Sequence, residues 1–337
     1  MKFEPLPLSL GELDDYYRAA RRFRRSLSRG NHLLRRRGES LEFHDFAQYT
    51  LGDDLRHVDW RATMRRGAAT LDHQSLVLRR YTAEEQLRII LSLDTRPTMM
   101  LPVIEPTRGA GHRPQPGINI SKLQVGRWLV EALSNIILEH ADRVILHQLF
   151  GDNGLIDELI GRNAADYLPT TLDDVCQPAR DARPNLSELD RFLPPTAVWV
   201  IISDYYFDLA NSRSLFDKIA DAYDRMCWVI VVDLNSWPYE RHLLTSGAPL
   251  FKIQEPDVGR EKCFAYTRVG AVDAAIAQHR QAVADEIGAR ADYVEWAWPG
   301  AEKNRQQPIE DKQQFSDFFR ELFRNDGTLR SIFEPDL

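Results

Sequence analysis

The sequence predicts an α/β protein in which a mostly parallel β-sheet is flanked by helices. Between residues 87 and 235, short runs of apolar residues alternate with longer amphipathic segments, as in strands buried on both faces and the helices that cover them. The chain has 337 residues, of which 43% are hydrophobic, so a large core can form. No apolar run reaches the roughly 20 residues that a membrane-spanning helix needs. The expected architecture is therefore Rossmann-like.

The expected elements follow the order that parallel strands with crossover helices require. Each strand is a short continuous apolar run such as LRIILSL, and each helix carries apolar residues three and four positions apart. The expected strands are 87–93, 143–150, 197–203 and 227–233, and the expected helices are 122–140 and 215–226. A C-terminal extension is expected to add strands at 250–255, 262–267 and 293–298 and a helix at 272–287.

Composition divides the chain into segments. They are a basic N-terminal arm (1–37), a β-rich module (38–82), the α/β domain (83–235), the C-terminal α/β extension (236–300) and a tail (301–337). The module is expected to consist of short extended pieces separated by Gly52 and Gly67. In the tail, five apolar residues form one helical stripe: Phe315, Phe318, Phe319, Leu322 and Phe323. We expect this stripe to dock on its own domain, with a partner groove as the alternative.

Charge and cysteine content narrow the class of protein. The net charge of −7 argues against nucleic acid or an anionic membrane as the partner. The arginine-rich segment 18–37 fits an acidic protein surface, with a nucleic acid or a solvated helix face as alternatives. The three cysteines are widely spaced and predict neither disulfides nor a zinc site. The N-terminus lacks the features of a signal peptide, so a cytoplasmic location is expected.

The segment EFHDFAQYTLGDDLRHVDWRATMRRG, residues 42 to 67, resembles the signature of the bacterial family called domain of unknown function 58 (DUF58). The matching residues are Glu42, Phe43, Tyr49, Gly52, Asp53, Asp54, Arg56, Asp59 and Trp60. The resemblance continues through Asp94, the pair Ser121 and Lys122, and SDYYFD at 203–208. The departures are Gln48, Met64 and Arg65, where the family has other residues.

This resemblance implies both a fold and a role. Family members have a von Willebrand factor type A-like domain, so residues 83–235 are expected to form one. Members resemble partners of MoxR-type AAA+ ATPases, and the pair is thought to assemble or activate client proteins in a chaperone-like way. No catalytic activity is established for the family. The resemblance therefore implies a protein-binding module with an ATPase and a client as partners.

A type A domain binds Mg²⁺ or Mn²⁺ through a D-x-S-x-S loop, a later threonine and a second aspartate at the carboxyl edge of its sheet. The corresponding loop here is LDTRPT, which contains Asp94, Arg96 and Thr98, and the second aspartate corresponds to Asp204. The later threonine corresponds to Thr170 or Thr171.

Arg96 stands where the family pattern has a metal-binding hydroxyl. A guanidinium has no lone pair to offer a cation, and its charge would repel one. Our hypothesis is that Arg96 folds into the ion position and pairs with Asp94 and Asp204, giving a metal-free mimic of the adhesion site. In one alternative, Arg96 points to solvent and the aspartates cap neighbouring turns. In the other, Thr98 and the aspartates keep an ion while Arg96 swings aside.

The signature itself allows two interpretations. Its charged residues alternate along a segment expected to be extended, so they can pair across strands. The functional alternative is a partner-binding surface made by Asp53, Asp54, Arg56, Asp59 and Trp60. Trp60 is also expected to be an apolar anchor against the α/β domain.

The conclusion from the sequence is a cytoplasmic, non-enzymatic binding module with a degenerate adhesion site and no expected cofactor. The long loop at 101–120 is expected to overhang that site. The alternative function is a metal-dependent hydrolase or phosphoesterase that uses the histidines and aspartates of 44–73. Its histidines are His44, His57 and His73, but no zinc-binding spacing such as HExxH supports it.

Overall fold

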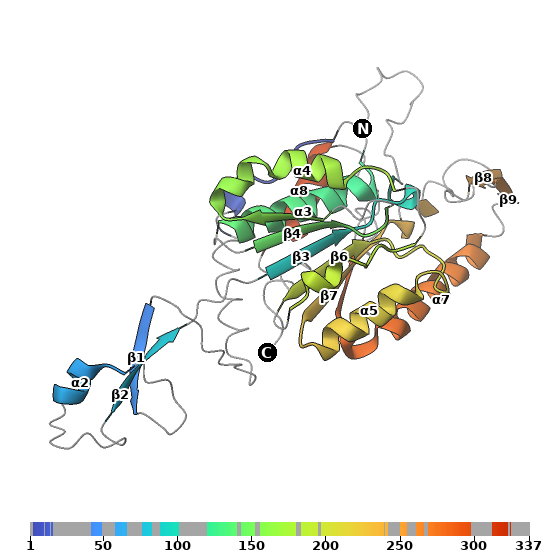
Figure 1. The fold of residues 1–337 in the computed structure, drawn as a ribbon. Coiled ribbons are helices and arrows are strands. Elements are labelled where there is room, and N and C mark those ends of the chain that lie inside the picture. The colour runs from blue at the N-terminus through green and yellow to red at the C-terminus, as the bar shows by residue number, and fades with distance from the viewer. Residues whose placement is uncertain are drawn as a thin grey trace. The chain divides into compact units, whose positions relative to one another are not determined.

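The computed structural model of the protein forms two compact units, residues 1–27 with 87–337 and residues 28–86. Figure 1 shows the elements of both units. The residues described are 3–9, 11–13, 15, 42–48, 58–65, 76–82, 88–100, 120–139, 143–151, 156–179, 183–194, 197–238, 240–241, 250–254, 261–265, 269–297, 312–322 and 324.

The large unit is built on a six-stranded sheet in the order β10-β7-β6-β3-β4-β5. Its strands are β3 (Arg88–Leu93), β4 (Arg143–Gln148), β5 (Ile156–Ile160), β6 (Val198–Ser203), β7 (Trp228–Asn235) and β10 (Asp292–Ala297). All neighbouring pairs are parallel except β4 with β5. The predicted α/β class, with a mostly parallel sheet flanked by helices, is confirmed.

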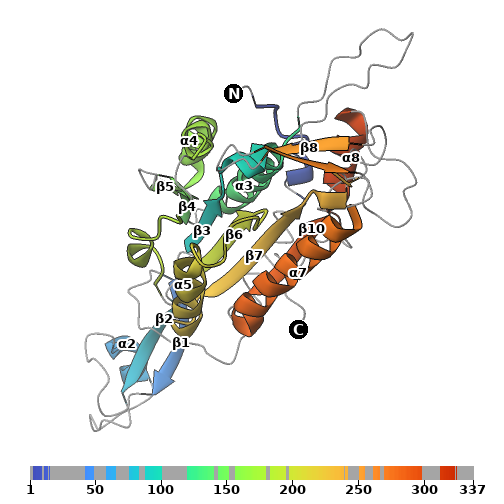
Figure 2. The ribbon, with the colours of Figure 1, turned by 90° about the vertical axis from the view of Figure 1, so that its right-hand side faces the viewer.

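Helices cover both faces of this sheet, as Figure 2 shows. One face carries α3 (Lys122–Leu138), α4 (Leu168–Val175) and α8 (Lys312–Leu322), and the other carries α5 (Arg213–Asp224) and α7 (Val269–Ile287). Successive strand residues enter opposite cores, because side chains alternate across a strand. Leu91 packs under α3, whereas Ile90 packs on the side of α5 and α7.

The sheet is larger than predicted at both edges. β5 and α4 were not predicted; β5 (IDELI) has two acids among its five residues, and of its described side chains Leu159 is the buried one. β10 was expected in a separate C-terminal extension, but it pairs with β7 along its full length. The sheet therefore continues past the boundary predicted at residue 235.

The tail helix α8 docks on its own unit, as expected. Phe315 and Phe319 lie against Trp128 of α3, with ring centroids 5.5 and 5.4 Å apart. The N-terminal segment packs nearby: the Glu4 carbonyl accepts hydrogen bonds from the Trp128 indole at 3.0 Å and from Gln124 at 3.0 Å. The apolar stripe of α8 is thus used inside the unit.

The small unit contains two strands and a short helix. β1 (Glu42–Gln48) and β2 (Val77–Thr82) are antiparallel, and α2 (Trp60–Arg65) lies between them in sequence. The prediction that the signature is extended through this region was wrong at α2, because Asp59 caps a helix there. Its Oδ1 accepts from the backbone nitrogens of Arg61 at 2.9 Å and Ala62 at 3.1 Å. In the large unit, a further antiparallel pair, β8 (Leu250–Gln254) with β9 (Glu261–Ala265), matches the two strands predicted at 250–255 and 262–267.

Candidate functional site

The candidate site lies where β3 and β6 end. These strands are parallel neighbours, so their carboxyl ends meet at the edge that open α/β sheets commonly use for ligands. Asp94 follows β3 and Asp204 follows β6, and both are buried. The Asp94 backbone nitrogen donates to the Ile202 carbonyl at 2.9 Å, and Asp94 Oδ2 accepts from the Ser203 hydroxyl at 2.7 Å. The fold thus brings the two predicted aspartates together.

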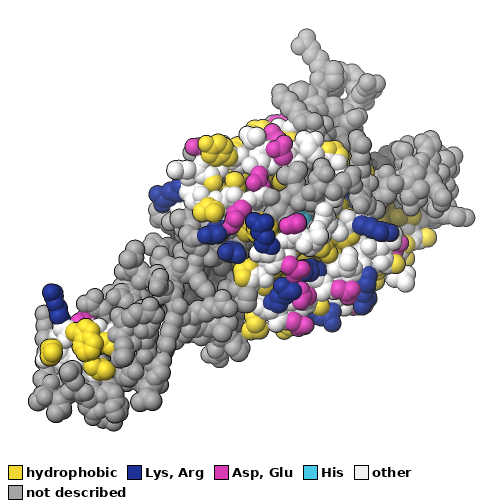
Figure 3. All heavy atoms as spheres, in the orientation of Figure 1, with side chains coloured by type: hydrophobic (Ala, Val, Ile, Leu, Met, Phe, Trp, Pro, Cys, Tyr) yellow, Lys and Arg dark blue, Asp and Glu magenta, His cyan; other side chains and the backbone are white. Residues whose placement is uncertain are grey.

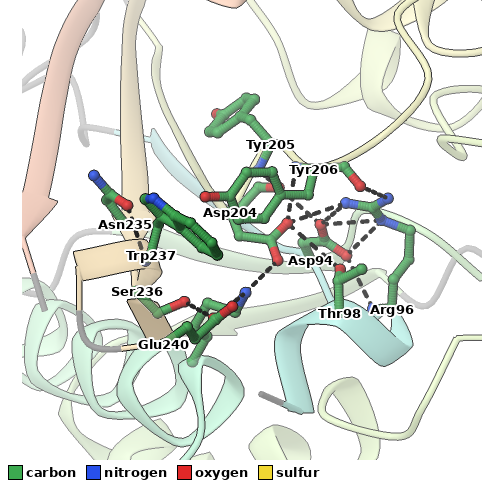
Figure 4. A network of polar contacts seen from close by, with 12 residues as sticks. Asp94, Arg96, Thr98, Asp204, Tyr205, Tyr206, Asn235, Ser236, Trp237 and Glu240 are labelled. Atoms are coloured by element: carbon green, nitrogen blue, oxygen red, sulfur yellow. Dashed lines mark hydrogen bonds and ion pairs between the residues drawn. The ribbon is translucent and has the colours of Figure 1, made fainter. Parts of the chain in front are cut away.

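Arg96 folds back onto both aspartates, as Figure 4 shows. Its Nε lies 3.1 Å from each Asp94 oxygen, and its Nη2 lies 2.6 Å from Asp94 Oδ2 and 3.4 Å from Asp204 Oδ1. Nη1 donates to the Tyr206 carbonyl at 3.3 Å. Only 1% of Arg96 is exposed, so this is the buried arrangement of the hypothesis rather than the solvent-facing alternative.

Two aromatic rings lie against the guanidinium of Arg96. Its central carbon lies 4.3 Å from the centre of the Phe150 ring and 5.0 Å from that of Phe207. A planar cation is attracted to such ring faces, and the rings also exclude water from its ion pairs. Arg96 is therefore held by packing as well as by charge.

A second cation, Lys122, completes the cluster. Its Nζ lies 2.8 Å from Asp204 Oδ2, and its side chain is 2% exposed. Lys122 is the first residue of α3, after Ser121, whose hydroxyl accepts from the Gln124 backbone nitrogen at 3.2 Å. The helix dipole disfavours a cation in this first turn, and the buried carboxylate of Asp204 compensates. In the sequence, Lys122 stands out only as part of the resemblance, and nothing there places it in the site.

The four charges of Asp94, Arg96, Lys122 and Asp204 balance; we call these residues the ion-pair cluster. Burial alone would raise the pKa of Asp204, but the positive charges of Lys122 and Arg96 outweigh this effect and hold the pKa of Asp204 below its ordinary value. A buried carboxylate without such partners would tend to take up a proton. Asp204 thus stays ionised at neutral pH because two cations replace the water it has lost.

The backbone after Asp204 is strained. Tyr205 has a φ of 54°, in the left-handed region that non-glycine residues seldom occupy. Three hydrogen bonds hold this turn. The Ser203 hydroxyl accepts from the Tyr205 nitrogen at 3.0 Å, Asp204 Oδ1 accepts from the Tyr206 nitrogen at 3.1 Å, and the His279 ring lies 2.8 Å from the Tyr205 carbonyl. Such strain is a frequent feature of functional sites.

The cluster reaches solvent through Glu240. Its Oε1 lies 3.7 Å from Lys122 Nζ, and its side chain is 25% exposed, whereas the aspartates are not exposed. Glu240 also accepts from the Ser236 hydroxyl, and this turn follows β7 (Figure 4). Lys122 therefore lies between the buried Asp204 and the partly exposed Glu240.

A neighbouring acid at the end of β7 has a different environment. Asp233 accepts hydrogen bonds from Arg280 of α7 and from Tyr293 of β10. Burial raises the pKa of Asp233 to about 7, although Arg280 and the Tyr293 hydroxyl act in the opposite direction. Asp233 therefore changes protonation near neutral pH, unlike Asp204.

The predicted threonines do not behave alike. The Thr98 hydroxyl lies 3.5 Å from Asp204 Oδ1, at the margin of the cluster. Thr170 is exposed on α4, and the Thr171 hydroxyl donates to the Tyr167 carbonyl of its own helix at 3.2 Å. The Thr95 hydroxyl accepts from Gln148 at 2.9 Å. Of the predicted hydroxyls, Thr98 is the one that contacts an aspartate of the cluster.

The predicted partner-binding residues and the predicted histidines belong to the small unit. Asp53, Asp54 and Arg56 lie outside the described residues, as do His57, His73, the segment 18–37 and loop residues 101–119. Asp59 is buried and caps α2, so its carboxylate serves the fold. Trp60 is 53% exposed. Only the backbone of His44, in β1, is described.

The cluster does not fit a resident Mg²⁺ or Mn²⁺. An ion bound by Asp94 and Asp204 would lie between their carboxylates, and the Arg96 guanidinium is in contact with both. That group offers hydrogen-bond donors only. Within the described part of the chain, no group of three or more His, Cys, Asp or Glu residues could hold a metal ion.

A buried serine and histidine form a second polar network inside the sheet. The Ser92 hydroxyl lies 2.8 Å from His147 Nδ1 and accepts from the Trp199 indole at 2.8 Å, and His147 Nε2 lies 2.9 Å from the Asn185 carbonyl. All three side chains are fully buried, and burial lowers the pKa of His147 to about 4. These hydrogen bonds therefore tie β3, β4 and β6 to the 183–194 segment.

Comparisons with known proteins add little. No protein-family model and no curated protein matches the chain. A conserved hypothetical protein, BatB from Bacteroides thetaiotaomicron, is similar at 13% identity and a TM-score of 0.33, over 63% of this chain and 90% of that chain. An uncharacterized membrane spanning protein from Vibrio fischeri is similar at 12% identity and a TM-score of 0.22, over 68% and 94% of the respective chains. Among the described residues here, no helix is long and apolar enough to cross a membrane.

Proposed function

We propose that this chain is a non-enzymatic protein-binding module of the DUF58 type, built on a von Willebrand factor type A-like domain. In this proposal it works in the cytoplasm with a MoxR-type AAA+ ATPase in the chaperone-like assembly or activation of a client protein. The support comes from the signature at 42–67 and from the six-stranded α/β sheet with acids at its carboxyl edge. The observation that carries the proposal is the ion-pair cluster.

The cluster supplies the charge of a divalent ion from within the chain. Arg96 and Lys122 each contribute one positive charge, and together they neutralise Asp94 and Asp204. A bound ion can dissociate, whereas these side chains cannot. The edge of the sheet therefore keeps its shape without metal, and partner binding is expected not to depend on divalent cations.

The same geometry indicates where a partner would reach the cluster. Arg96 is enclosed by Phe150 and Phe207, so its guanidinium does not face the solvent. Lys122 has the partly exposed Glu240 on its outer side. A carboxylate from a partner would therefore compete with Glu240 for Lys122, rather than bind Arg96 directly.

Isothermal titration calorimetry with Mg²⁺ and Mn²⁺ tests the metal-free site. The native chain should show no stoichiometric binding at the ion-pair cluster. Arg96→Ser removes the guanidinium and restores a hydroxyl, so it should gain an ion site that Asp204→Ala, added to it, abolishes. Tight 1:1 binding by the native chain that Asp204→Ala removes would contradict the proposal.

Affinity capture from the native cell tests the partner. The chain should recover an AAA+ ATPase, and recovery should persist when EDTA is present. Arg213→Ala is a matched control, because that arginine forms exposed ion pairs on α5 and should not affect recovery. Hydrolysis of a phosphoester by the purified chain, or loss of the ATPase in EDTA, would count against the proposal.

A further inference from the structure

The short helix α2 of the small unit buries polar residues and exposes large apolar ones, the reverse of an ordinary surface helix. Its inward positions hold polar residues, because Asp59 is 8% exposed and Thr63 is fully buried. Its outward positions hold large apolar residues, because Trp60 is 53% exposed and Met64 is 63% exposed. Each pair is four residues apart and therefore shares one side of the helix. A surface helix normally buries its apolar side.

Hydrogen bonds on the inward side hold the helix in this orientation. The Asp59 nitrogen donates to the Val77 carbonyl of β2 at 2.8 Å, and the Val77 nitrogen donates to the Thr63 hydroxyl at 3.0 Å. The Thr63 hydroxyl also donates to the Asp59 carbonyl at 2.9 Å. Rolling α2 to bury Trp60 would break these bonds and leave buried polar groups unsatisfied. The apolar side is thus held outward by the fold of the unit.

We propose that the outward side of α2, formed by Trp60, Arg61 and Met64, is a docking surface for a protein that offers an apolar groove with acidic residues at its rim. Tryptophan, methionine and arginine are enriched in protein interfaces, and aromatic anchors there commonly carry much of the binding energy. Arg61 is exposed on this helix, and the only acid nearby in α2 and its cap, Asp59, is buried. Among the described residues of α2 and its cap, the exposed charge beside Trp60 and Met64 is therefore positive, which favours an acidic rim.

The surface can be followed in Figure 3, where hydrophobic side chains gather on the described part of the small unit, with a basic side chain and a small area of an acidic one beside them. It goes beyond the proposed function at the sheet edge and does not depend on the ion-pair cluster, because α2 belongs to the other compact unit. The two surfaces can therefore fail or succeed separately in one set of experiments.

Site-specific photocrosslinking of the full chain in its native cell tests this surface. The substitution is Met64→benzoylphenylalanine, and the matched control is the same change at Met226, which is 53% exposed in the large unit. Position 64 should give an adduct with one discrete protein, and mass spectrometry should map it to an apolar segment flanked by Asp or Glu. Position 226 should not give that adduct.

Variants then separate the roles of the anchor and of the charge. Trp60→Ala and Arg61→Glu should each lower the adduct yield at position 64 by about tenfold or more. The side chain of Arg61 is exposed, and its contact with Asp59 is made by its backbone nitrogen, which Arg61→Glu keeps. Arg61→Glu is therefore informative even if Trp60→Ala does not fold. Arg96→Ser should leave the adduct unchanged, which distinguishes failure at α2 from failure of the ion-pair cluster.

Four results would overturn the proposal. They are a crosslink from position 64 to residues 87–337 of the same chain, a crosslink only to a second copy, the same adducts from positions 64 and 226, and no adduct at all. An adduct that survives Arg61→Glu, or that maps to a segment without acids, would refute the acidic rim.

Discussion

Replacing Arg96 by alanine is the sharpest test of the ion-pair cluster. The change removes one of four buried charges and leaves two carboxylates with one cation. Lys122 remains 2.8 Å from Asp204, so the stranded charge is mainly on Asp94, which keeps only hydrogen bonds such as that from Ser203. Breaking a buried pair in this way costs about 3 to 5 kcal/mol. That is a large part of the roughly 5 to 15 kcal/mol by which a domain is stable.

Urea unfolding at neutral pH measures this loss. Tryptophan fluorescence follows mainly the large unit, because Trp128, Trp199 and Trp296 are buried in it. The matched control is Arg213→Ala, which removes exposed ion pairs to Asp217 and Glu286 and should cost less than about 1 kcal/mol. The slope of the unfolding free energy against urea should be the same in all variants, because the surface exposed on unfolding is unchanged.

The outcome separates the interpretations of the LDTRPT loop. If Arg96→Ala loses no more stability than Arg213→Ala, the guanidinium is not a buried partner of Asp94 and the mimic hypothesis fails. A double-mutant cycle with Asp94→Asn provides an independent measure, since the two changes should be strongly non-additive if the residues are paired.

Further expected outcomes concern pH, packing and the tail. Folding raises the pKa of Asp233 to about 7, so the folded state binds a proton more readily there and acidification from pH 7 to pH 4 increases stability. Folding lowers the pKa of His147 to about 4, so the unfolded state binds a proton more readily there and the same acidification decreases stability. Asp233→Asn should uncover the histidine contribution, so that this variant loses on the order of 3 kcal/mol between pH 6.5 and pH 4 in urea titrations; a flat pH profile would contradict this. Gly126→Ala in α3 should lower the free energy of unfolding by about 1 to 3 kcal/mol, because the added methyl would lie 2.6 Å from a methyl of the buried Leu93. Gly270→Ala in α7 is the control: an added methyl there meets nothing within 4 Å, so the change should be neutral or stabilising. Thermal unfolding measures both variants. Phe319→Ala should cost about 3 to 5 kcal/mol in urea unfolding, because its ring is fully buried in the large unit; a loss below about 1 kcal/mol would show that the tail helix is not docked.

The main strands could be predicted because each carries its own signal. Runs such as LRIILSL and VWVIIS carry apolar residues at both odd and even positions, the pattern of strands in a sheet that is buried on both faces. β5 lies at the edge of the sheet and has two acids among its five residues, so its sequence carries no comparable apolar run. The helix α2 was missed because its polar side is the buried one, which reverses the pattern that sequence analysis relies on.

The candidate site was only partly predictable for a similar reason. The resemblance to a type A domain picked out Asp94 and Asp204, and their position after parallel strands agrees with a meeting at one edge of the sheet. The chemistry of Arg96, a donor without lone pairs, indicated that it would displace an ion rather than bind one. Lys122 offered no such indication, since a lysine that begins a helix is usually solvated. The later threonine was placed by resemblance alone, and Thr171 instead bonds to its own helix.

The sequence by itself determined the α/β class, the order of the principal strands and helices, the two acids at strand ends and the arginine between them. Only the tertiary structure decided that Lys122 supplies the second positive charge, that β10 extends the main sheet, and that α2 holds Trp60 outward. Periodicity reports how one segment divides its own residues between core and solvent. Pairing between distant residues depends instead on which segments become neighbours, and no local pattern records that.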